Sequence, residues 1–312
     1  MNDMISVVIP MFNEVDSVPR LHAQLTRAVH GLSGRWEFIF VDDGSRDGTW
    51  EALTALAQQD PRVRAVRLKR NFGQTPAMAC GIDLARGEVI VTMDGDLQND
   101  PADIPQLLEK LEEGYDVVCG WRVKRQDKLW TRKIPSMIAN RLIGWLTGVR
   151  LHDYGCSLKA YRAATIKHTP LYAESHRFIP AFSTLTGALV TEIPVHHRAR
   201  QFGCTKYTLS RTWRVSLDMI TVSLLMKFAT KPLRFFGLAA LGSSLAALTC
   251  LMRSWPWYAG PSRSIPQILP ASAVLGVWLA GHLAIVGWLA ELCVATTHTR
   301  PERFIAVGEE QG

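Results

Sequence analysis

The sequence has little cysteine, and its cysteines lack the spacing of a metal centre. The six residues of this type lie far apart along the chain (Cys80, Cys119, Cys156, Cys204, Cys250 and Cys293). Paired thiolates of the kind that hold structural zinc are therefore missing. Reduced and mostly buried thiols are favoured over a disulfide framework.

Two glycine-rich nucleotide-binding loops are also missing from the sequence. No G-x-G-x-x-G motif follows the first expected strand, and no G-x-x-x-x-G-K-[ST] motif occurs. Their absence disfavours a dinucleotide-dependent enzyme and a P-loop ATPase. The stretch MNDMISVVIP has no basic segment, and Pro10 interrupts its apolar run, so we expect no signal peptide.

Acidic residues are fewer than basic ones, which gives a formal net charge of +7. Such an excess is typical of proteins that bind nucleic acid, anionic lipid or phosphorylated substrates. Aromatic and basic residues are not interleaved as a base-stacking surface requires, and the basic residues cluster beside apolar segments. We therefore expect a membrane and a phosphorylated substrate as partners, and no nucleic acid. The sequence leaves the oligomeric state open, a homo-oligomer included.

Charge is almost absent from two C-terminal segments. Residues 235–252 carry none, and residues 268–290 contain only His282 as a chargeable group. Because about 20 helical residues cross the hydrocarbon core of a bilayer, both segments suit a membrane span. Trp255 and Trp257 lie between them, as expected at a membrane interface. Two core helices of a soluble protein are the alternative.

Basic residues flank these segments more than they occupy the connecting loop, which favours a hairpin with both ends in the cytoplasm. We expect a multi-pass protein of the inner (plasma) membrane with a cytoplasmic catalytic domain. The expected parts are a catalytic domain over 1–208, a juxtamembrane amphipathic helix over 209–232, spans over 233–252 and 268–290, an external loop over 253–267 and a cytoplasmic tail over 291–312.

Strand and helix patterns alternate in the N-terminal part. Apolar runs predict strands at 5–10, 36–43, 63–69 and 88–94, and three- and four-residue spacing of apolar residues predicts helices at 15–30, 47–59 and 74–86. This alternation predicts an α/β fold with a mainly parallel sheet covered on both faces. Polar motifs follow the four strands (PMFNE, DDGSRDGT, KRNFGQ and DGDLQND). Because ligands bind at the carboxyl ends of such strands, we expect the functional site there.

The motif Asp94-Gly95-Asp96 places two carboxylates at the end of one strand, with Gln98 close behind. Oxygen ligands suit a hard cation such as Mg²⁺ or Mn²⁺, which commonly bridges protein carboxylates and substrate phosphates. Acidic turns are common, so the motif alone is weak evidence.

Two further segments predict amphipathic basic helices. Apolar residues share one face over 129–149 and again over 209–229, with arginines and lysines beside them. A helix that faces the core is one interpretation of each, and a helix resting on anionic lipid headgroups is the other. The two apolar segments downstream favour the second.

The motifs VVIPMFNE, VDDGSRDGT, RNFGQTPAMACGID and MDGDLQNDP, in this order, resemble glycosyltransferase family 2. The later stretches GWRVKRQDK, KIPSMIANRLI, DYGCSLKAYR and RARQFGCTKY resemble the polyprenyl-phosphate glycosyltransferases within it: dolichyl-phosphate mannose synthases and, more closely, bacterial undecaprenyl-phosphate glycosyl- and aminoarabinose-type transferases. The resemblance covers essentially the whole chain. It implies a GT-A (Rossmann-like) catalytic domain with a C-terminal two-helix transmembrane hairpin.

The resemblance also implies roles for residues at the donor site. The base and ribose of a UDP- or GDP-linked sugar would contact Pro10, Phe12, Glu14, Asp42 and Asp43, with Gly44 leaving room. Phe12 lacks the hydroxyl of the Tyr that many relatives have there. Asp94 and Asp96 would bind ribose and metal, and Gln98 would complete the metal shell. Arg200 would neutralise the donor diphosphate, with Lys206 close by.

The acceptor phosphate would contact Arg122, Arg132 and Ser136, and Lys133 could serve in place of Arg132. A cation held by Asp96 would offset the charge of the leaving nucleoside diphosphate. The phosphate monoester of the lipid is already an anion at neutral pH, so it needs no general base. Asp153 either orients the acceptor or caps a turn, and His196 and His197 fit a strand edge better than catalysis.

The leading interpretation is therefore an inverting, membrane-anchored enzyme that transfers a sugar to polyprenyl phosphate. A dolichyl-phosphate mannose synthase-type enzyme that uses GDP-mannose is an alternative within the same group. A polysaccharide synthase is a weaker alternative, because its Q-x-x-R-W motif is missing here. The intact metal and acceptor motifs disfavour a non-enzymatic nucleotide-binding anchor.

Overall fold

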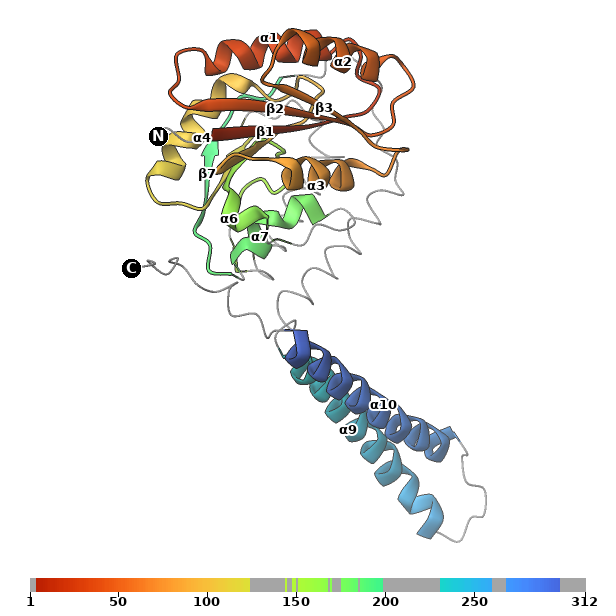
Figure 1. Cartoon of the computed structure of the whole chain (residues 1–312). Coiled ribbons are helices and arrows are strands. Elements are labelled where there is room, and N and C mark those ends of the chain that lie inside the picture. The colour runs from red at the N-terminus through yellow and green to blue at the C-terminus, as the bar shows by residue number, and fades with distance from the viewer. Residues whose placement is uncertain are drawn as a thin grey trace. The chain divides into compact units, whose positions relative to one another are not determined.

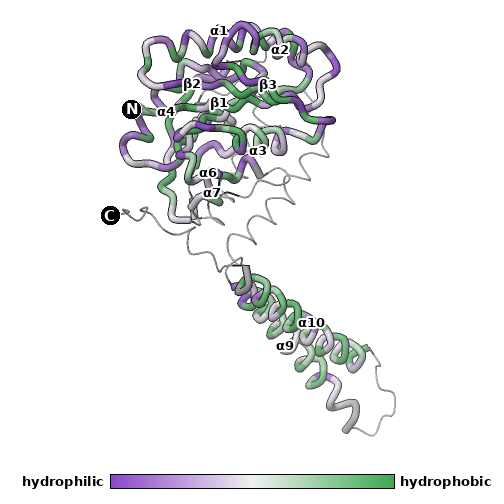
Figure 2. Tube along the Cα trace, viewed as in Figure 1, coloured by the Kyte–Doolittle hydropathy of each residue, from purple (hydrophilic) through white to green (hydrophobic). Residues whose placement is uncertain are grey.

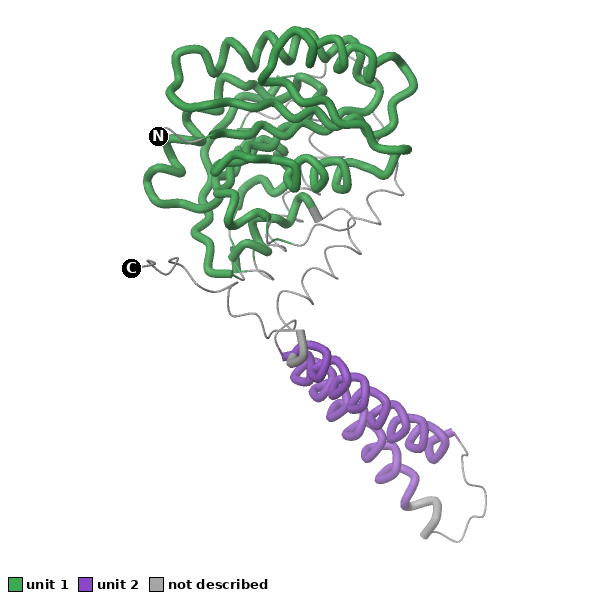
Figure 3. The backbone as a smooth tube through the Cα atoms, viewed as in Figure 1, with its two compact units in different colours: residues 1–223 green, residues 224–312 purple. Residues whose placement is uncertain are grey.

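A computed structural model describes residues 4–123, 144, 148–149, 151–167, 169, 175–184, 186–198, 231–259 and 268–297. The chain divides into two compact units, residues 1–223 and residues 224–312 (Figure 3). The helices expected at 129–149 and 209–229 lie largely or wholly outside the described residues.

The first unit contains a seven-stranded sheet in the order β3-β2-β1-β4-β6-β5-β7. Its strands are β1 (Met4–Met11), β2 (Arg35–Asp42), β3 (Val63–Arg67), β4 (Val89–Thr92), β5 (Val117–Trp121), β6 (Lys159–Arg162) and β7 (Val190–Pro194). All neighbouring pairs are parallel except those of β6, which runs antiparallel to both β4 and β5. The expected mainly parallel α/β sheet is confirmed, with one reversed strand added.

Helices cover both faces of the sheet (Figure 1). The longer helices are α1 (Val18–Val29), α2 (Thr49–Gln59), α3 (Gln74–Leu84) and α4 (Ile104–Glu112). The short ones are η1 (Pro101–Asp103), α6 (Ala163–Ile166), η3 (Ser175–Phe178) and α7 (Ile179–Thr184). Alternate residues of the central strands point to opposite faces, and both sets are apolar, as in sheets buried on both sides. Val7 belongs to the core cluster that α1, α2 and α4 complete.

On the opposite face of the sheet, α3 packs closely against β1 and β2 at a glycine, Gly81. A Cβ on Gly81 would lie 2.4 Å from Cγ1 of Val8 and 3.1 Å from Cγ2 of Val41. Only a residue without a side chain lets α3 approach β1 and β2 this closely. This packing fixes the start of α3, and with it Gln74, at the rim of the sheet.

Element boundaries differ from the expected ones by a few residues. The first helix begins at Val18 rather than at 15, because Pro19 in the first turn suits a helix start and residues 14–17 form a turn. The second begins after Gly48, whose φ of 92° is left-handed. The fourth strand ends at Thr92, so Asp94 lies in the loop that follows rather than in the strand.

The second unit consists of two helices, α9 (Pro232–Ala259) and α10 (Ile268–Thr297). Both are long and apolar enough to cross a membrane, over Pro232–Trp255 and Ile268–Val294. Large apolar side chains remain exposed along them, Leu238 at 68% and Trp278 at 62%, and Figure 2 shows apolar residues over much of both helices. The helix α9 continues to Ala259, into the range 253–267 that is expected to form the external loop.

Small residues line the contact between α9 and α10. The buried positions recur every seven residues, at Ala240, Ala247 and Ser254 on one helix and at Ala273, Ala280 and Gly287 on the other. A seven-residue repeat keeps one face of each helix toward its partner. Small residues at such a seam let backbones approach closely, which is how helices associate in lipid. The side chain of Glu291 also accepts a hydrogen bond from the backbone N of Leu233, 3.0 Å away.

Candidate active site

The candidate site lies at the carboxyl ends of β1, β2 and β4. The register aligns Met11 of β1 with Asp42 of β2, so the loops that follow these strands begin at one rim. The loop after β4 packs onto the end of β1, because a Cβ on Gly95 would lie 2.0 Å from Sδ of Met11 and 3.2 Å from the carbonyl oxygen of Pro10. Gly95 therefore brings the two neighbouring aspartates beside the β1 loop.

Asp42 and Asp43 hold the loops of this rim together. Oδ1 of Asp42 accepts a hydrogen bond from the backbone N of Ser45 at 3.0 Å, and Oδ2 lies 3.3 Å from Nε of Arg67. Asp43 accepts hydrogen bonds from the backbone N atoms of Phe72 at 2.7 Å and Gly73 at 2.8 Å. Both carboxylates therefore have a structural role besides any contact with a nucleotide.

Gly44 is required by its backbone. Its φ is +70°, and a Cβ there would lie 2.6 Å from the carbonyl carbon of Arg70. The loops after β2 and β3 therefore touch at this glycine. Nearby, Oε2 of Glu14 accepts a hydrogen bond from Oγ of Ser17 at 2.9 Å, which closes the loop after β1. These contacts shape the rim on the side where a nucleotide is expected.

Asp94 and Asp96 are close enough to influence one another. Burial and the negative charge of Asp96 raise the pKa of Asp94 to about 6, against lowering effects of Ser157, Arg122 and Arg177. Oδ1 of Asp94 also accepts a hydrogen bond from Nε2 of Gln74 at 2.6 Å. Two carboxylates held together in a poorly hydrated position repel, and a cation between them would relieve that repulsion.

The turn after Asp96 is strained in a way that serves the site. Leu97 is buried and has a φ of 62°, a left-handed conformation that a branched side chain seldom adopts. This turn returns the chain so that the backbone N of Gln98 donates to Oδ1 of Asp96 at 3.2 Å. Nε2 of Gln98 donates to the carbonyl oxygen of Arg198, 3.5 Å away.

The donor atoms fit a hard divalent cation. Asp94, Asp96 and Gln98 offer carboxylate and amide oxygens, the ligands that Mg²⁺ and Mn²⁺ prefer. Within the described ranges no group of three or more His, Cys, Asp or Glu residues could hold a metal by itself. Such a partial set suits a cation that completes its shell with phosphate oxygens and water, rather than a closed structural site.

A buried ion pair lies on the same rim, after β5. Nε of Arg122 donates to Oδ2 of Asp153 at 2.6 Å, and Nη2 donates to Oδ1 at 2.9 Å. Burial lowers the pKa of the guanidinium, but the hydrogen bond and charge of Asp153 outweigh it and raise that pKa above its usual range. A Cβ on Gly155 would lie 3.1 Å from Nη2. Arg122 therefore stays charged and fixed beside the acidic loop.

The comparisons with known proteins agree with this geometry. Residues 6–169 match the family described as Glycosyl transferase family 2. The chain belongs to glycosyl transferase family 2. It is 49% identical over 252 residues to a dodecaprenyl-phosphate galacturonate synthase of Rhizobium johnstonii, which covers 80% of this chain and 74% of the relative. It is 38% identical over 293 residues to an undecaprenyl-phosphate 4-deoxy-4-formamido-L-arabinose transferase of Salmonella choleraesuis, covering 92% and 87% respectively.

A solved structure shares the fold of this glycosyltransferase. It is glucosyl-3-phosphoglycerate synthase from Mycobacterium tuberculosis in complex with Mn²⁺, uridine diphosphate and glucosyl-3-phosphoglycerate, with a TM-score of 0.57. The match covers 72% of this chain and 80% of that chain, at 20% sequence identity. The expected GT-A-like fold is thereby confirmed.

Several residues with expected roles in the glycosyltransferase lie outside the described residues. They are Arg132, Lys133 and Ser136 on the acceptor side and Arg200 and Lys206 on the donor side. The structure therefore brings together Pro10, the aspartate pairs, Gln98 and Arg122, and their roles in binding remain predictions. Asp153, for which two roles were left open, is the partner of Arg122.

Several polar residues behind the rim were not predicted individually from the sequence. Gln74 donates to Asp94, and Ser157, which helps to lower the pKa of Asp94, donates from its Oγ to Oδ1 of Asn99 at 2.8 Å. Lys159 is buried on β6, where burial lowers its pKa, and its Nζ donates to the carbonyl oxygen of Tyr154 at 3.3 Å. Gln74, Ser157 and Lys159 all occur within motifs typical of the family, which is the signal that could have found them.

The cysteines and histidines of the glycosyltransferase agree with a structural role. All described cysteines are free thiols, and burial raises the pKa of Cys119 to about 12 and that of Cys156 to about 11. Thiols with such pKa values are not reactive at neutral pH. Nδ1 of His196 lies 2.7 Å from Oδ1 of Asp103, just beyond the end of β7. This histidine therefore tethers a strand end, as expected.

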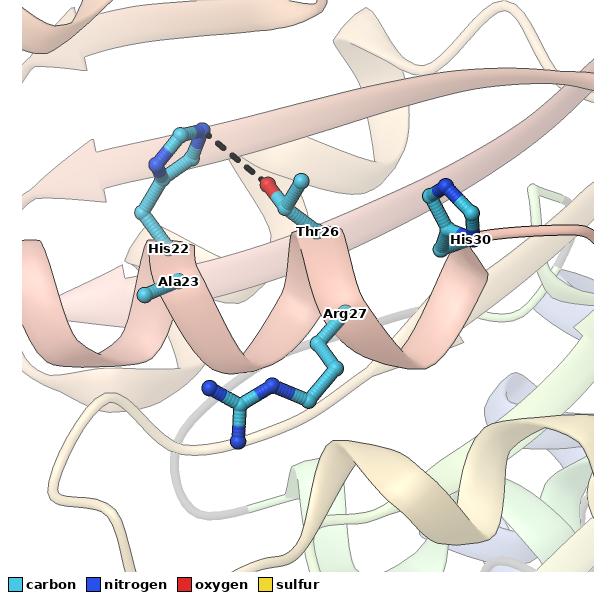
Figure 4. A pocket seen from close by; sticks show the side chains of 5 residues that line it. All are labelled: His22, Ala23, Thr26, Arg27 and His30. Carbon is cyan, nitrogen blue, oxygen red and sulfur yellow. Dashed lines mark hydrogen bonds between the residues drawn. The ribbon is translucent and has the colours of Figure 1, made fainter.

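A surface hollow on α1 lies away from the candidate site (Figure 4). It is lined by His22, Ala23, Thr26 and Arg27 of that helix and by His30, the residue that follows it. Because α1 returns antiparallel to the strands, its C-terminal end lies toward their amino ends, and His22 likewise contacts Asp60, just before β3 begins, at 2.8 Å. The hollow is therefore at the opposite edge of the sheet from the acidic loop, and it contributes nothing to the candidate site.

Proposed function

We propose that this glycosyltransferase moves a sugar from a nucleotide-sugar donor to the phosphate of a polyprenyl phosphate, with undecaprenyl phosphate as the expected carrier. One observation carries the proposal: the aspartate pair after β4 lies on the same rim as the buried, charged guanidinium of Arg122. An acidic cation site next to a fixed arginine suits a reaction between two phosphate-bearing substrates. The names of the two relatives support the same acceptor class.

Asp94, Asp96 and Gln98 would hold a divalent cation, Mg²⁺ or Mn²⁺, as their oxygen donors suggest. Such a cation offsets the negative charge that develops on a leaving nucleoside diphosphate. Gln74 holds Asp94 in place for this task, and the turn at Leu97 holds Asp96 and Gln98 together. The Mn²⁺ and uridine diphosphate in the structural relative support this reading.

The acceptor needs positioning more than it needs a base. A phosphate monoester has its second pKa near about 6, so its oxygen is a nucleophile at neutral pH without proton removal. Arg122 can make two parallel hydrogen bonds to phosphate, and Asp153 fixes the orientation of that guanidinium. A direct attack of this oxygen on the sugar carbon inverts its configuration.

The two apolar helices support a location at a membrane. The lipid acceptor resides there, and a hairpin keeps the catalytic domain at its surface. We propose the inner membrane, with the catalytic domain and the C-terminal tail on the cytoplasmic side, where nucleotide sugars are made. The bias of basic residues toward the ends of the hairpin supports this orientation.

The test is a transfer assay with the purified full-length protein in detergent. Undecaprenyl phosphate and undecaprenol would each be incubated with a panel of labelled UDP- and GDP-sugars, including uronic acid and amino-arabinose donors. The proposal predicts a labelled lipid from one donor class, only with the phosphorylated acceptor, and only when Mg²⁺ or Mn²⁺ is present. Label transferred to undecaprenol, or to a growing polysaccharide, would contradict it.

A further inference from the structure

Arg177 is a partly buried cation to which the reaction described above assigns no task. It lies in η3, just before α7, and its Nε is inaccessible to solvent. Among the residues that the structure describes, this nitrogen has no hydrogen-bond partner, and no carboxylate forms an ion pair with the guanidinium. Burying a donor without a partner is costly, so this nitrogen would gain from an acceptor.

A chain of contacts places Arg177 at the acidic loop. Nδ1 of the adjacent His176 lies 2.7 Å from Oγ1 of Thr75, near the start of α3. The residue before it, Gln74, donates to Asp94 at 2.6 Å. Figure 1 shows α7, which continues η3, close to α3 on one side of the sheet. Two hydrogen bonds therefore tie the segment that carries Arg177 to the residue beside the expected cation.

The charge of Arg177 reaches this part of the site. Its guanidinium is among the groups that lower the pKa of Asp94, and it lowers the pKa of Lys159 as well. Arg122, the other arginine that acts on Asp94, is neutralised by Asp153. Arg177 differs because no described carboxylate neutralises it. An anion bound from solution would supply the missing partner.

The position favours the acceptor side over the donor side. The residues expected to contact the nucleotide follow β1 and β2, whereas α7 packs against β5 and β7. The strand β5 leads directly to Arg122, the residue expected at the acceptor phosphate. An arginine on this half of the sheet therefore lies nearer to a lipid phosphate than to the nucleotide base and ribose.

We propose that Arg177 binds the phosphate of the lipid acceptor, as a second guanidinium beside Arg122. This inference rests on the proposed function and deepens it by assigning a residue that recognises the phosphate. Two guanidinium groups can hold the oxygens of a phosphate dianion from two sides and leave one oxygen toward the sugar. The hydrogen bond between His176 and Thr75 keeps Arg177 in position.

The test measures binding rather than turnover. Isothermal titration calorimetry on the full-length protein would compare farnesyl phosphate, farnesol and UDP with Mn²⁺ as probes. Arg177→Gln should weaken the binding of farnesyl phosphate by about tenfold to a hundredfold, and the affinities for UDP and farnesol should stay unchanged. Arg177→Lys should recover part of that affinity, because it restores the charge but not the two-pronged geometry. Arg35→Gln, an exposed arginine at the amino end of β2, is the matched control.

Unchanged affinity for farnesyl phosphate in Arg177→Gln overturns the inference, and so does a loss that appears with UDP instead. Thermal unfolding checks that the variants are folded. Where the glutamine variant is unstable, the lysine variant, which keeps the charge, is compared with the wild type instead. If the affinity for farnesyl phosphate depends on Arg177 but the wild type transfers no sugar, the proposed function is wrong and the assignment of Arg177 to a phosphate site remains correct. If the wild type transfers sugar and Arg177→Gln binds equally well, only the inference fails.

Discussion

Arg122 and Asp153 form a two-point ion pair, with Nε–Oδ2 at 2.6 Å and Nη2–Oδ1 at 2.9 Å, in the interior of the catalytic unit. The pair joins the residue after β5 to the loop before β6, 31 positions apart in sequence. An arginine expected to bind phosphate is thus also part of the packing of the fold. Its two roles can be separated by experiment.

Removing either partner of this pair leaves a buried charge. Asp153→Ala should lower the free energy of unfolding by about 3–5 kcal/mol, because Arg122 then has no counterion. Arg122→Ala should also lose stability, and it should reduce lipid-dependent transfer by about a hundredfold or more, since roughly 1.4 kcal/mol corresponds to tenfold in rate. Thermal unfolding and the transfer assay measure the two effects.

The control for this pair is Lys110→Ala, which removes an exposed partner of Glu113 and should change neither stability nor transfer. UDP binding should survive in folded Arg122→Ala. A variant that folds normally but no longer binds UDP would move Arg122 to the diphosphate side of the site.

Glu37 should make stability depend on pH. Burial works to raise its pKa, but hydrogen bonds from Ser6 and the backbone N of Arg86, with Arg64 beside them, lower it below the ordinary 4.5. A lowered folded-state pKa contributes stability that is complete above the unfolded-state pKa and is lost as the pH falls.

Glu37→Gln should therefore reduce the free energy of unfolding by about 1–3 kcal/mol at neutral pH, because the charged acceptor is gone. The difference from the wild type should narrow as the pH falls below about 4.5, where the wild-type carboxylate also loses its charge. Thermal unfolding across this pH range measures it. If the stability difference between the wild type and Glu37→Gln widens in acid, the folded-state pKa of Glu37 is not lowered and the prediction is wrong.

The close packing of α9 and α10 should depend on Gly287. A Cβ there would lie 2.7 Å from Cβ of Phe236, whereas nothing lies within 4 Å of a Cβ on Gly281. Gly287→Leu should separate the helices and lower the unfolding temperature in detergent, while Gly281→Leu should change it little. Equal effects of the two substitutions would show that helix propensity, rather than packing, is being measured.

Gly44 should be intolerant of a side chain for two reasons that a control can separate. Gly44→Ala places a left-handed backbone strain on alanine and drives its Cβ within 2.6 Å of Arg70. Gly31→Ala carries the same strain, with a φ of +84°, but meets nothing within 4 Å. Gly44→Ala should lower the free energy of unfolding by more than Gly31→Ala does, and we expect a loss of about 1 kcal/mol for Gly31→Ala. Equal losses would exclude the collision as the cause.

The sequence predicted the strand and helix order because parallel sheets buried on both faces leave long apolar runs. It also predicted that Asp94, Asp96 and Gln98 share a rim, since the ends of parallel strands meet at one edge. The pairing of Arg122 with Asp153 depends on β6 inserting antiparallel between β4 and β5, which no local pattern specifies. The loop-holding bonds of Asp43 likewise depend on contacts between distant segments.

The conformations of short segments also could not be predicted from the sequence. Arg177 lies in a single helical turn with no periodic pattern, and its significance comes only from its unpartnered, buried Nε and from the contacts that tie its segment to the loop of Asp94. The start of α1 at Val18 was missed because the residues before Pro19 have helical apolar spacing but fold as a turn. In both places tertiary contacts decide what the local pattern leaves open.

The central claim is that the aspartates after β4 support sugar transfer to a lipid phosphate. The most direct measurement is the rate of label transfer from the active nucleotide sugar to undecaprenyl phosphate by Asp96→Asn, which changes only the charge, and by Asp83→Asn, an exposed control on α3. We expect Asp96→Asn to lose at least about a hundredfold in rate, as for the loss of a transition-state electrostatic contact. The wild type should stop in EDTA and recover with Mg²⁺ or Mn²⁺. Full transfer by Asp96→Asn, or by metal-free wild type, would contradict the account.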